Sequence, residues 1–401
     1  MLSTMISFGY RMVRTTDTRL LWKMGYNFGY KGMRSVQRFK ARLKQGKVFP
    51  PFLYISITNS CNLRCQGCWV DVDKPQSLIN FEDMNQLICN AKQHGNSFFG
   101  ILGGEPFLHP ELIRILKAHP DCYFQIFTNG HAITDKVASE LRSAGNATPL
   151  ISIEGTESVS DVRRGRKAVL SRTMAGIEAS VRNRLITGVA SSVCQSNFHD
   201  LVKESWIDYL ISKGVHYTWF HTFRPVGPVP NPQLALSSEQ GLQLRRFIMD
   251  MRNRKPIGII DAYYDDKGQA LCPAATGISH HISPFGDVEP CPIIQFANES
   301  IRDNDGDLFQ TMTESRLLND FRKTAAKATR GCIVLERPDL LTEIVERNDA
   351  RDTTLRQMAM TELSSLDSRS SQYNPGNEVP EENWIYRFAK KYWFFGFGAY
   401  T

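Results

Sequence analysis

Three cysteines with close spacing are the residues of this chain whose types most directly suggest chemistry. Cys61, Cys65 and Cys68 fall within eight residues, in the stretch SCNLRCQGCW that follows an apolar run. Thiolates bind zinc and iron–sulfur clusters. A 4Fe-4S cluster held by three protein thiolates keeps one iron free for a small molecule. The spacing therefore predicts such a cluster or, as the alternative, a zinc site with a remote fourth ligand.

The segments that must position these thiols alternate between strand-like and helix-like. Short apolar runs occupy residues 52–58, 97–102, 122–128, 149–154, 185–193 and 215–221. Between them lie amphipathic stretches, one of which we expect to be a helix capped by Asn80 that buries Met84, Leu87, Ile88 and Ala91. This alternation predicts a parallel α/β sheet, flat and doubly wound or curled toward a barrel. In either case ligands bind at the carboxyl ends of the strands, where the cysteines lie.

Further motifs follow the next strands in order. These are Gly103-Gly104-Glu105-Pro106, Thr128-Asn129-Gly130, Ser152 with Glu154, and Asp161 with Arg163-Arg164-Gly165. Together with the cysteine array they resemble the radical SAM superfamily, over roughly residues 52–225. The resemblance implies an α/β fold, a partial (β/α)6 TIM-like barrel with a small cysteine-containing C-terminal domain.

The same resemblance implies roles for individual residues. Cys61, Cys65 and Cys68 would hold a 4Fe-4S cluster that reductively cleaves S-adenosylmethionine (SAM) to a 5′-deoxyadenosyl radical, with an electron donor such as flavodoxin or ferredoxin. That radical abstracts hydrogen from a substrate. The implied SAM-binding residues are Gly103, Gly104, Glu105, Pro106, Thr128, Asn129, Ser152, Glu154, Arg163 and Phe220. One position departs from the family: Gly67 precedes the third cysteine, where an aromatic residue usually packs near adenine, so Trp69 or Phe220 is the candidate for that contact.

A second group of cysteines lies in the C-terminal part. Cys272, Gly286 and Cys291 form a C-x13-G-x4-C pattern, and Cys332 follows later. The pattern resembles the opening of the SPASM module and implies one auxiliary 4Fe-4S cluster, the "twitch" form, with Cys272, Cys291 and Cys332 as ligands. His280, His281, water or the substrate would complete it, and buried structural cysteines are the alternative. The other three, Cys89, Cys122 and Cys194, are expected in the core.

Composition and charge limit the remaining possibilities. With 42% hydrophobic and 22% charged residues, no apolar run near ~20 residues and no secretory signal, the sequence predicts a cytoplasmic globular protein. Residues 1–50 carry eleven Lys or Arg and one acid, Asp17, and residues 18–46 have helical apolar spacing. This arm either contacts the inner face of a membrane peripherally, as the aromatic tail with Trp384, Tyr386, Trp393, Phe394 and Phe395 also suggests, or packs on the barrel. No nucleic-acid-binding fold is visible.

We therefore expect four parts: a basic amphipathic helical arm (1–50), the barrel core (51–230), a linker helix with an auxiliary cluster domain (231–345), and a polar linker with an aromatic basic tail (346–401). The auxiliary domain is expected to be loop-rich and held together by something other than a core. The leading hypothesis is a radical SAM enzyme that acts on a peptide or protein side chain or on a membrane-associated, lipid-like molecule. A leader-binding winged helix is not evident, which weakens the peptide interpretation. The alternative is a zinc-stabilised, non-catalytic binding protein.

Overall fold

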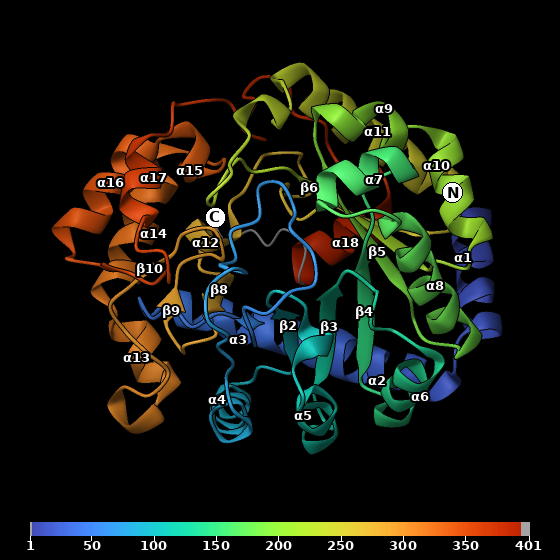
Figure 1. Cartoon of the computed structure of the whole chain (residues 1–401), viewed down its shortest axis with the longest axis horizontal. Coiled ribbons are helices and arrows are strands. Elements are labelled where there is room, and N and C mark those ends of the chain that lie inside the picture. Colours follow the sequence, from blue (N-terminus) through green and yellow to red (C-terminus); the bar gives the residue numbers. More distant parts are fainter. Residues whose placement is uncertain (1, 394–401) are drawn as a thin grey trace.

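A nine-stranded sheet forms the centre of the computed structural model, which describes residues 2–393 (Figure 1). Its strand order is β7-β6-β5-β4-β3-β2-β1-β8-β9, and every pair is parallel except β8 with β9. The strands are β1 (Phe52–Ser56), β2 (Phe98–Leu102), β3 (Tyr123–Thr128), β4 (Ala147–Ser152), β5 (Gly188–Val193), β6 (Tyr217–Thr222), β7 (Gly258–Ile260), β8 (Ser279–Ile282) and β9 (Val288–Glu289). A separate antiparallel pair joins β10 (Phe296–Ala297) to β11 (Arg351–Asp352). The predicted partial barrel is confirmed.

Helices cover the outer face of this sheet and build the C-terminal part. Those of the N-terminal arm are α1 (Leu2–Thr15), α2 (Thr18–Lys23), the π-helical segment η1 (Met24–Tyr30) and α3 (Lys31–Leu43). Those of the barrel are α4 (Phe81–Gln93), η2 (Pro106–Leu108), α5 (Leu112–Ala118), α6 (Asp135–Ala144), α7 (Glu157–Arg164), α8 (Val169–Arg182), η3 (Gln195–Asn197), α9 (Phe198–Leu201) and α10 (Glu204–Ser212). The remainder are η4 (Pro232–Leu234), α11 (Ser238–Arg254), α12 (Pro273–Thr276), η5 (Asn304–Gly306), α13 (Leu308–Glu314), α14 (Arg316–Ala328), α15 (Ile333–Glu336), α16 (Pro338–Arg347), α17 (Ala359–Ser364) and α18 (Trp384–Tyr392).

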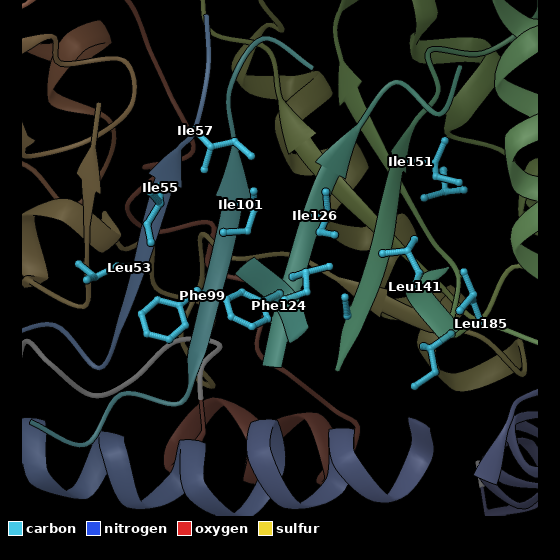
Figure 2. Close-up of a cluster of buried hydrophobic side chains, with 14 of the residues drawn as sticks. Leu53, Ile55, Ile57, Phe99, Ile101, Phe124, Ile126, Leu141, Ile151 and Leu185 are labelled. Atoms are coloured by element: carbon cyan, nitrogen blue, oxygen red, sulfur yellow. The ribbon is translucent and has the colours of Figure 1, made fainter. Parts of the chain in front are cut away.

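The alternation of side chains along each strand separates a helix-facing core from a lumen. Figure 2 shows the helix-facing set, in which Ile55, Ile101 and Ile126 come from successive strands. The helix predicted after Asn80 is α4, and the Asn80 side chain accepts a hydrogen bond from the backbone of Asp83, as expected for an N-cap. The lumen side carries a smaller apolar cluster around Leu150, Ala190 and Trp219.

The N-terminal arm packs across the opposite edge of the sheet, where the strands begin. Val36 and Phe39 of α3 are buried there against Phe52 and Phe98, the first residues of β1 and β2. Figure 2 shows the blue arm and the red C-terminal helix below the strands. Among the described residues, no helix is long and apolar enough to cross a membrane. Trp393 is the last tail residue described, so the predicted interfacial residues Phe394 and Phe395 lie outside the described part of the chain.

The C-terminal part has a hydrophobic core of its own, which corrects the expectation of a domain without one. Phe321 of α14 and Ile344 of α16 are fully buried in this second cluster, and Phe296 of β10 joins it. The amphipathic helices α14 and α16 enclose the cluster because each turns an apolar stripe inward, and the single turn α15 adds its buried apolar residues. Val226, from the segment after β6, also packs here and connects this part to the barrel.

Candidate functional site

The loop after β1 places Cys61, Cys65 and Cys68 at the carboxyl edge of the sheet, and all three are partly buried. Burial, reinforced by the nearby Cys65, raises the pKa of the Cys61 thiol to about 11. The same causes raise the pKa of Cys68 to about 12. The three thiols therefore lie near one another in a place where thiolates need compensating positive charge. Iron of a cluster supplies that charge and deprotonates its thiol ligands, so the donor set fits a 4Fe-4S cluster.

Two glycines of the GGEP motif let the turn after β2 pack against the backbone of residues 58–60, which precede Cys61. A side chain at Gly103 would place its Cβ 2.6 Å from the carbonyl oxygen of Thr58, and one at Gly104 would lie 2.2 Å from that of Ser60. The backbone of Gly104 donates to the Thr58 carbonyl at 2.7 Å. Only glycine fits at both positions, so this motif fixes where the cysteine loop begins.

The carboxylate of Glu105 ties the same turn to the third strand. It is buried, and it accepts hydrogen bonds from the Thr128 hydroxyl (2.7 Å) and from the backbone N–H of Asn129 (2.8 Å). Asn129 in turn donates from its side chain to the side-chain amide oxygen of Asn62, the residue after Cys61, at 2.7 Å. The first three motifs therefore form one hydrogen-bonded unit. Pro106 begins the short helix η2 of this turn. The Glu105 side chain thus joins the turn after β2 to the turn after β3. A direct contact of Glu105 with SAM stays a prediction.

Two arginines after β4 reach the cysteine loop, and Arg164 lies closer to the thiols than Arg163. Arg164 donates to the Cys65 sulfur at 3.6 Å and to the Glu154 carboxylate at 2.5 Å. Burial alone would lower the pKa of Arg164, but the Glu154 carboxylate and Cys65 raise it above its ordinary value. A guanidinium is therefore fixed beside the candidate cluster.

Arg163 is buried in the wall of the site, where its guanidinium lies 3.9 Å from the Glu154 carboxylate. Its guanidinium lies 4.7 Å from the centre of the Phe223 ring and donates to the Gln66 carbonyl. Asp161 does not reach the thiols, because its carboxylate accepts from the backbone of Ala168 and Val169 at the start of α8. Ser152 ends β4, partly buried. Roles of Arg163, Ser152 and Glu154 in SAM binding stay predictions.

Phe223 occupies the space beside Gly67. Gly67 has a φ of +70°, and a Cβ there would lie 2.3 Å from Cε2 of the Phe223 ring. Phe220, in contrast, faces the helices and packs edge-on against Phe247 of α11, at 6.2 Å between ring centres. Trp69 packs toward the C-terminal cluster. The aromatic ring that packs against Gly67 is thus Phe223, rather than the predicted Trp69 or Phe220.

The structure brings the other three predicted cysteines together, although they are far apart in sequence. Cys272 precedes α12, Cys291 follows β9 and Cys332 precedes α15. Burial, reinforced by the nearby Cys332, raises the pKa of Cys272 to about 11. Burial also raises the pKa of Cys291, and Cys272 and Cys332 contribute to this rise. The three therefore form a second thiol group, whose service as cluster ligands stays a prediction.

Arg224 is a residue of this second group that the sequence did not reveal. Burial alone would lower its pKa, but the nearby Cys332 thiol and Tyr263 phenol outweigh this and raise it. Its guanidinium lies over the Tyr263 ring at 5.3 Å and donates to Gln372. Within residues 2–393 it forms no ion pair with a carboxylate. Nothing in the sequence around Arg224 distinguishes a surface arginine from one that lies against other side chains.

Other predicted residues lie as follows. Both ring nitrogens of His281 are engaged, by Ser56 at 2.7 Å and by Glu289 at 2.6 Å, while His280 contacts the Pro290 carbonyl. Cys122 and Cys194 are buried as expected, but the prediction for Cys89 is wrong, because it lies on the exposed face of α4. No group of three or more His, Cys, Asp or Glu side chains within residues 2–393 is placed to hold a single metal ion.

Comparison with known proteins gives consistent results. The family model described as the Radical SAM superfamily matches residues 55–194. Among curated proteins, a GTP 3′,8-cyclase of Parasynechococcus marenigrum is 28% identical over 50% of this chain and 58% of its own length. The subtilosin biosynthesis protein AlbA of Bacillus subtilis is 27% identical over 59% of this chain and 54% of its own. This chain thus spans little more than half the length of these relatives.

Among solved structures, Streptococcus suis SuiB bound to precursor peptide SuiA superimposes with a TM-score of 0.60 at 16% identity. The superposition covers 71% of this chain and 70% of SuiB. At this level of identity the likeness shows a shared fold. The superposition takes in more of this chain than residues 55–194, the segment that the family model matches.

Proposed function

We propose that this chain is a radical SAM enzyme, which cleaves SAM reductively and abstracts hydrogen from a substrate, because the Radical SAM superfamily model matches residues 55–194. A 4Fe-4S cluster on Cys61, Cys65 and Cys68 would supply the electron for that cleavage, itself reduced by a donor such as flavodoxin or ferredoxin. The observation that carries the proposal is the hydrogen-bonded unit that joins the cysteine loop to the GGEP and TNG turns through Asn62, Asn129 and Glu105.

This chain's own residues would position the cofactors and exclude water. Arg164 holds positive charge beside Cys65, and Phe223 and Gly67 form an apolar wall on the same loop. A side chain at Gly227 would place its Cβ 2.2 Å from the carbonyl oxygen of Cys68. Glycine at this position therefore lets the segment after β6 pack against the third cysteine. Rigid surroundings that exclude water suit chemistry in which water would quench a reactive intermediate.

We assign the second thiol group, Cys272, Cys291 and Cys332, to one auxiliary 4Fe-4S cluster within the segment 231–345. Support comes from the convergence of the three thiols and from Arg224, which is partly buried and has no carboxylate partner within residues 2–393. A buried cation without a counter-charge is costly, and a cluster bound by three thiolates would provide that counter-charge.

The substrate class that the site favours is a peptide or protein side chain. A cavity of about 240 Å³ lies between the segment Pro225–Pro230 and the C-terminal part, lined there by Ile294, Val334 and Leu363. The cavity has apolar walls, and one side of it is formed by the irregular segment 225–230. This combination suits an extended peptide that places an apolar side chain in the cavity. The names of two similar proteins, a bacteriocin biosynthesis protein and one crystallised with a precursor peptide, agree with this class.

The decisive experiment is anaerobic reconstitution followed by reduction with dithionite in the presence of SAM. Wild-type protein should be brown and form 5′-deoxyadenosine. Cys65→Ala should abolish this product, because two thiolates do not retain the cluster, whereas Cys89→Ala, which removes an exposed cysteine of α4, should leave it unchanged. Product formation by Cys65→Ala would refute the assignment. Colourless protein with stoichiometric zinc would instead favour the non-catalytic alternative.

A further inference from the structure

Large aromatic side chains are exposed along the N-terminal arm. Trp22, Tyr26 and Tyr30 follow one another at intervals of four residues, with ring centres 6.2 and 5.8 Å apart. Trp22 is 73% exposed. They lie on α2 and the π-helical segment η1, on the side away from the barrel, whereas Leu20 and Asn27 of the same segments are buried. Packing on the barrel therefore does not account for these three rings.

The C-terminal helix α18 has an unusual burial pattern for a surface helix, because a lysine is buried and three aromatic residues are exposed. It buries Lys390, whose ammonium donates to Asp261 at 3.0 Å inside a cluster of charged side chains. It exposes Trp384, Phe388 and Tyr392, each more than half accessible and four residues apart. A helix on the surface of a globular protein normally turns its apolar stripe inward. The outer face of α18 is therefore built for surroundings other than bulk water.

These two stripes lie at one edge of the molecule. The indole N–H of Trp393 donates to the Phe28 carbonyl at 2.9 Å, and the Lys40 ammonium donates to the carbonyl of Lys391 at 3.1 Å. Figure 2 shows the arm and α18 together below the amino ends of the strands. We call the exposed set Trp22, Tyr26, Tyr30, Trp384, Phe388 and Tyr392 the aromatic face.

Positive charge surrounds the aromatic face. Lys31 lies over the Tyr26 ring at 5.2 Å, and Arg34 donates to the Tyr30 hydroxyl at 3.3 Å. None of the eleven Lys and Arg residues of the arm forms an ion pair with a carboxylate within residues 2–393. Carboxylates therefore do not cancel the positive charge of the arm, although some of its cations, such as Arg11 and Lys23, donate to backbone carbonyls of the barrel.

We propose that the aromatic face docks on the surface of a bilayer that contains anionic lipid. Tryptophan and tyrosine rings favour the headgroup level of a membrane, and cations beside them attract lipid phosphates. A second copy of this chain is a poorer occupant, since it would bring equal positive charge. The inference does not rest on the proposed function, because docking requires neither cluster nor SAM.

Docking in this orientation has a consequence for the substrate. The aromatic face lies at the amino ends of the strands, and Cys61 follows the carboxyl end of β1, so the candidate active site would face away from the bilayer. Phe28, Phe52 and Phe98 close the barrel on the membrane side. A substrate would therefore enter from the aqueous side, which favours a peptide over a lipid drawn from the membrane.

The test is flotation of the full chain with phosphatidylcholine vesicles, with or without about one third phosphatidylglycerol. We expect binding to the anionic vesicles, a blue shift of tryptophan emission from Trp22 and Trp384, and weakening by salt. The variant Trp22→Ser/Phe388→Ser should bind at least about tenfold more weakly. Met358→Ser removes a side chain that is 47% exposed on the C-terminal part and should bind as wild type.

Circular dichroism of each variant verifies that it is folded. Failure of the wild type to bind either vesicle would overturn the proposal. So would binding that the double variant leaves unchanged, since the cations alone would then suffice. A wild-type dimer in gel filtration that the double variant converts to monomer would also overturn it and assign the aromatic face to self-association.

Discussion

Gly67 gives the sharpest test of the packing around the third cysteine. Gly67→Ala would introduce a Cβ 2.3 Å from Cε2 and 2.5 Å from Cζ of Phe223, at a residue whose φ is +70°. The left-handed backbone alone costs a non-glycine residue about 1 kcal/mol. Overpacking of a buried ring adds about 1–3 kcal/mol. We therefore expect Gly67→Ala to lower the free energy of unfolding by about 2–4 kcal/mol.

The chain offers a control that separates these two contributions. Gly46 has nearly the same backbone angle, φ +72°, but nothing lies within 4 Å of its Cβ position. Gly46→Ala should therefore cost only the backbone part, about 1 kcal/mol. Phe223→Leu removes the two ring atoms that clash, so in that background Gly67→Ala should also fall to about 1 kcal/mol.

The assay is urea unfolding of the four proteins of this cycle together with Gly46→Ala, followed by iron determination after anaerobic reconstitution. A coupling free energy of about 1–3 kcal/mol between residues 67 and 223 is expected. Iron content should fall in Gly67→Ala and recover in the double variant. Additivity within about 0.5 kcal/mol would refute the reasoning, because Phe223 would then not fill the space beside Gly67.

Two further predictions concern the second thiol group and pH. Cys291→Ala should reduce iron from about eight to about four atoms per chain and abolish substrate turnover while 5′-deoxyadenosine still forms; unchanged iron would contradict the auxiliary cluster. Burial and the nearby Arg11 lower the pKa of His216 to about 4, while its ring bonds Thr15 and the Thr187 backbone. Because the unfolded chain then binds a proton that the folded chain does not, stability is fully present above about pH 6.5 and falls toward pH 4, by about 2 kcal/mol at pH 4.5. Urea unfolding at pH 7 and 4.5 should show this loss in wild type but not in His216→Gln; equal losses would contradict it.

The strands that could be predicted from sequence are those with long apolar runs. All six predicted runs overlap a strand of the sheet, because short, mainly apolar runs between turn signals leave few other ways to be buried. The strands β7 and β8 were missed: one has three residues, and the other, Ser279–Ile282, contains His280 and His281. The periodicity of the sequence also does not predict that β8 pairs with β1. Sequence alone therefore left the choice between a flat and a curled sheet open.

Whether a site residue could be predicted likewise depends on whether its role is set by residues nearby in the sequence. Cys61, Cys65, Gly103 and Gly104 are recognisable because local spacing carries their roles, and the structure explains the glycines by contacts under 3 Å with a neighbouring backbone. Phe223 was not selected because its role depends on a contact between segments 156 positions apart in the chain. Strand alternation held a partial signal, since it turns Trp219 into the lumen and Phe220 toward the helices.

A partly buried arginine lies beside each thiol group, Arg164 at the first and Arg224 at the second, and the difference between the two indicates how their charge is balanced. Arg164 shares its charge between Cys65 and the Glu154 carboxylate, so it remains compensated whatever the thiol protonation. Arg224 has no carboxylate partner within residues 2–393 and lies beside Cys332 and Tyr263. A guanidinium stays charged in proteins, so neutral thiols would leave Arg224 uncompensated in a buried place. The second group is therefore the one whose local electrostatics depend most on thiolates, and hence on a bound cluster.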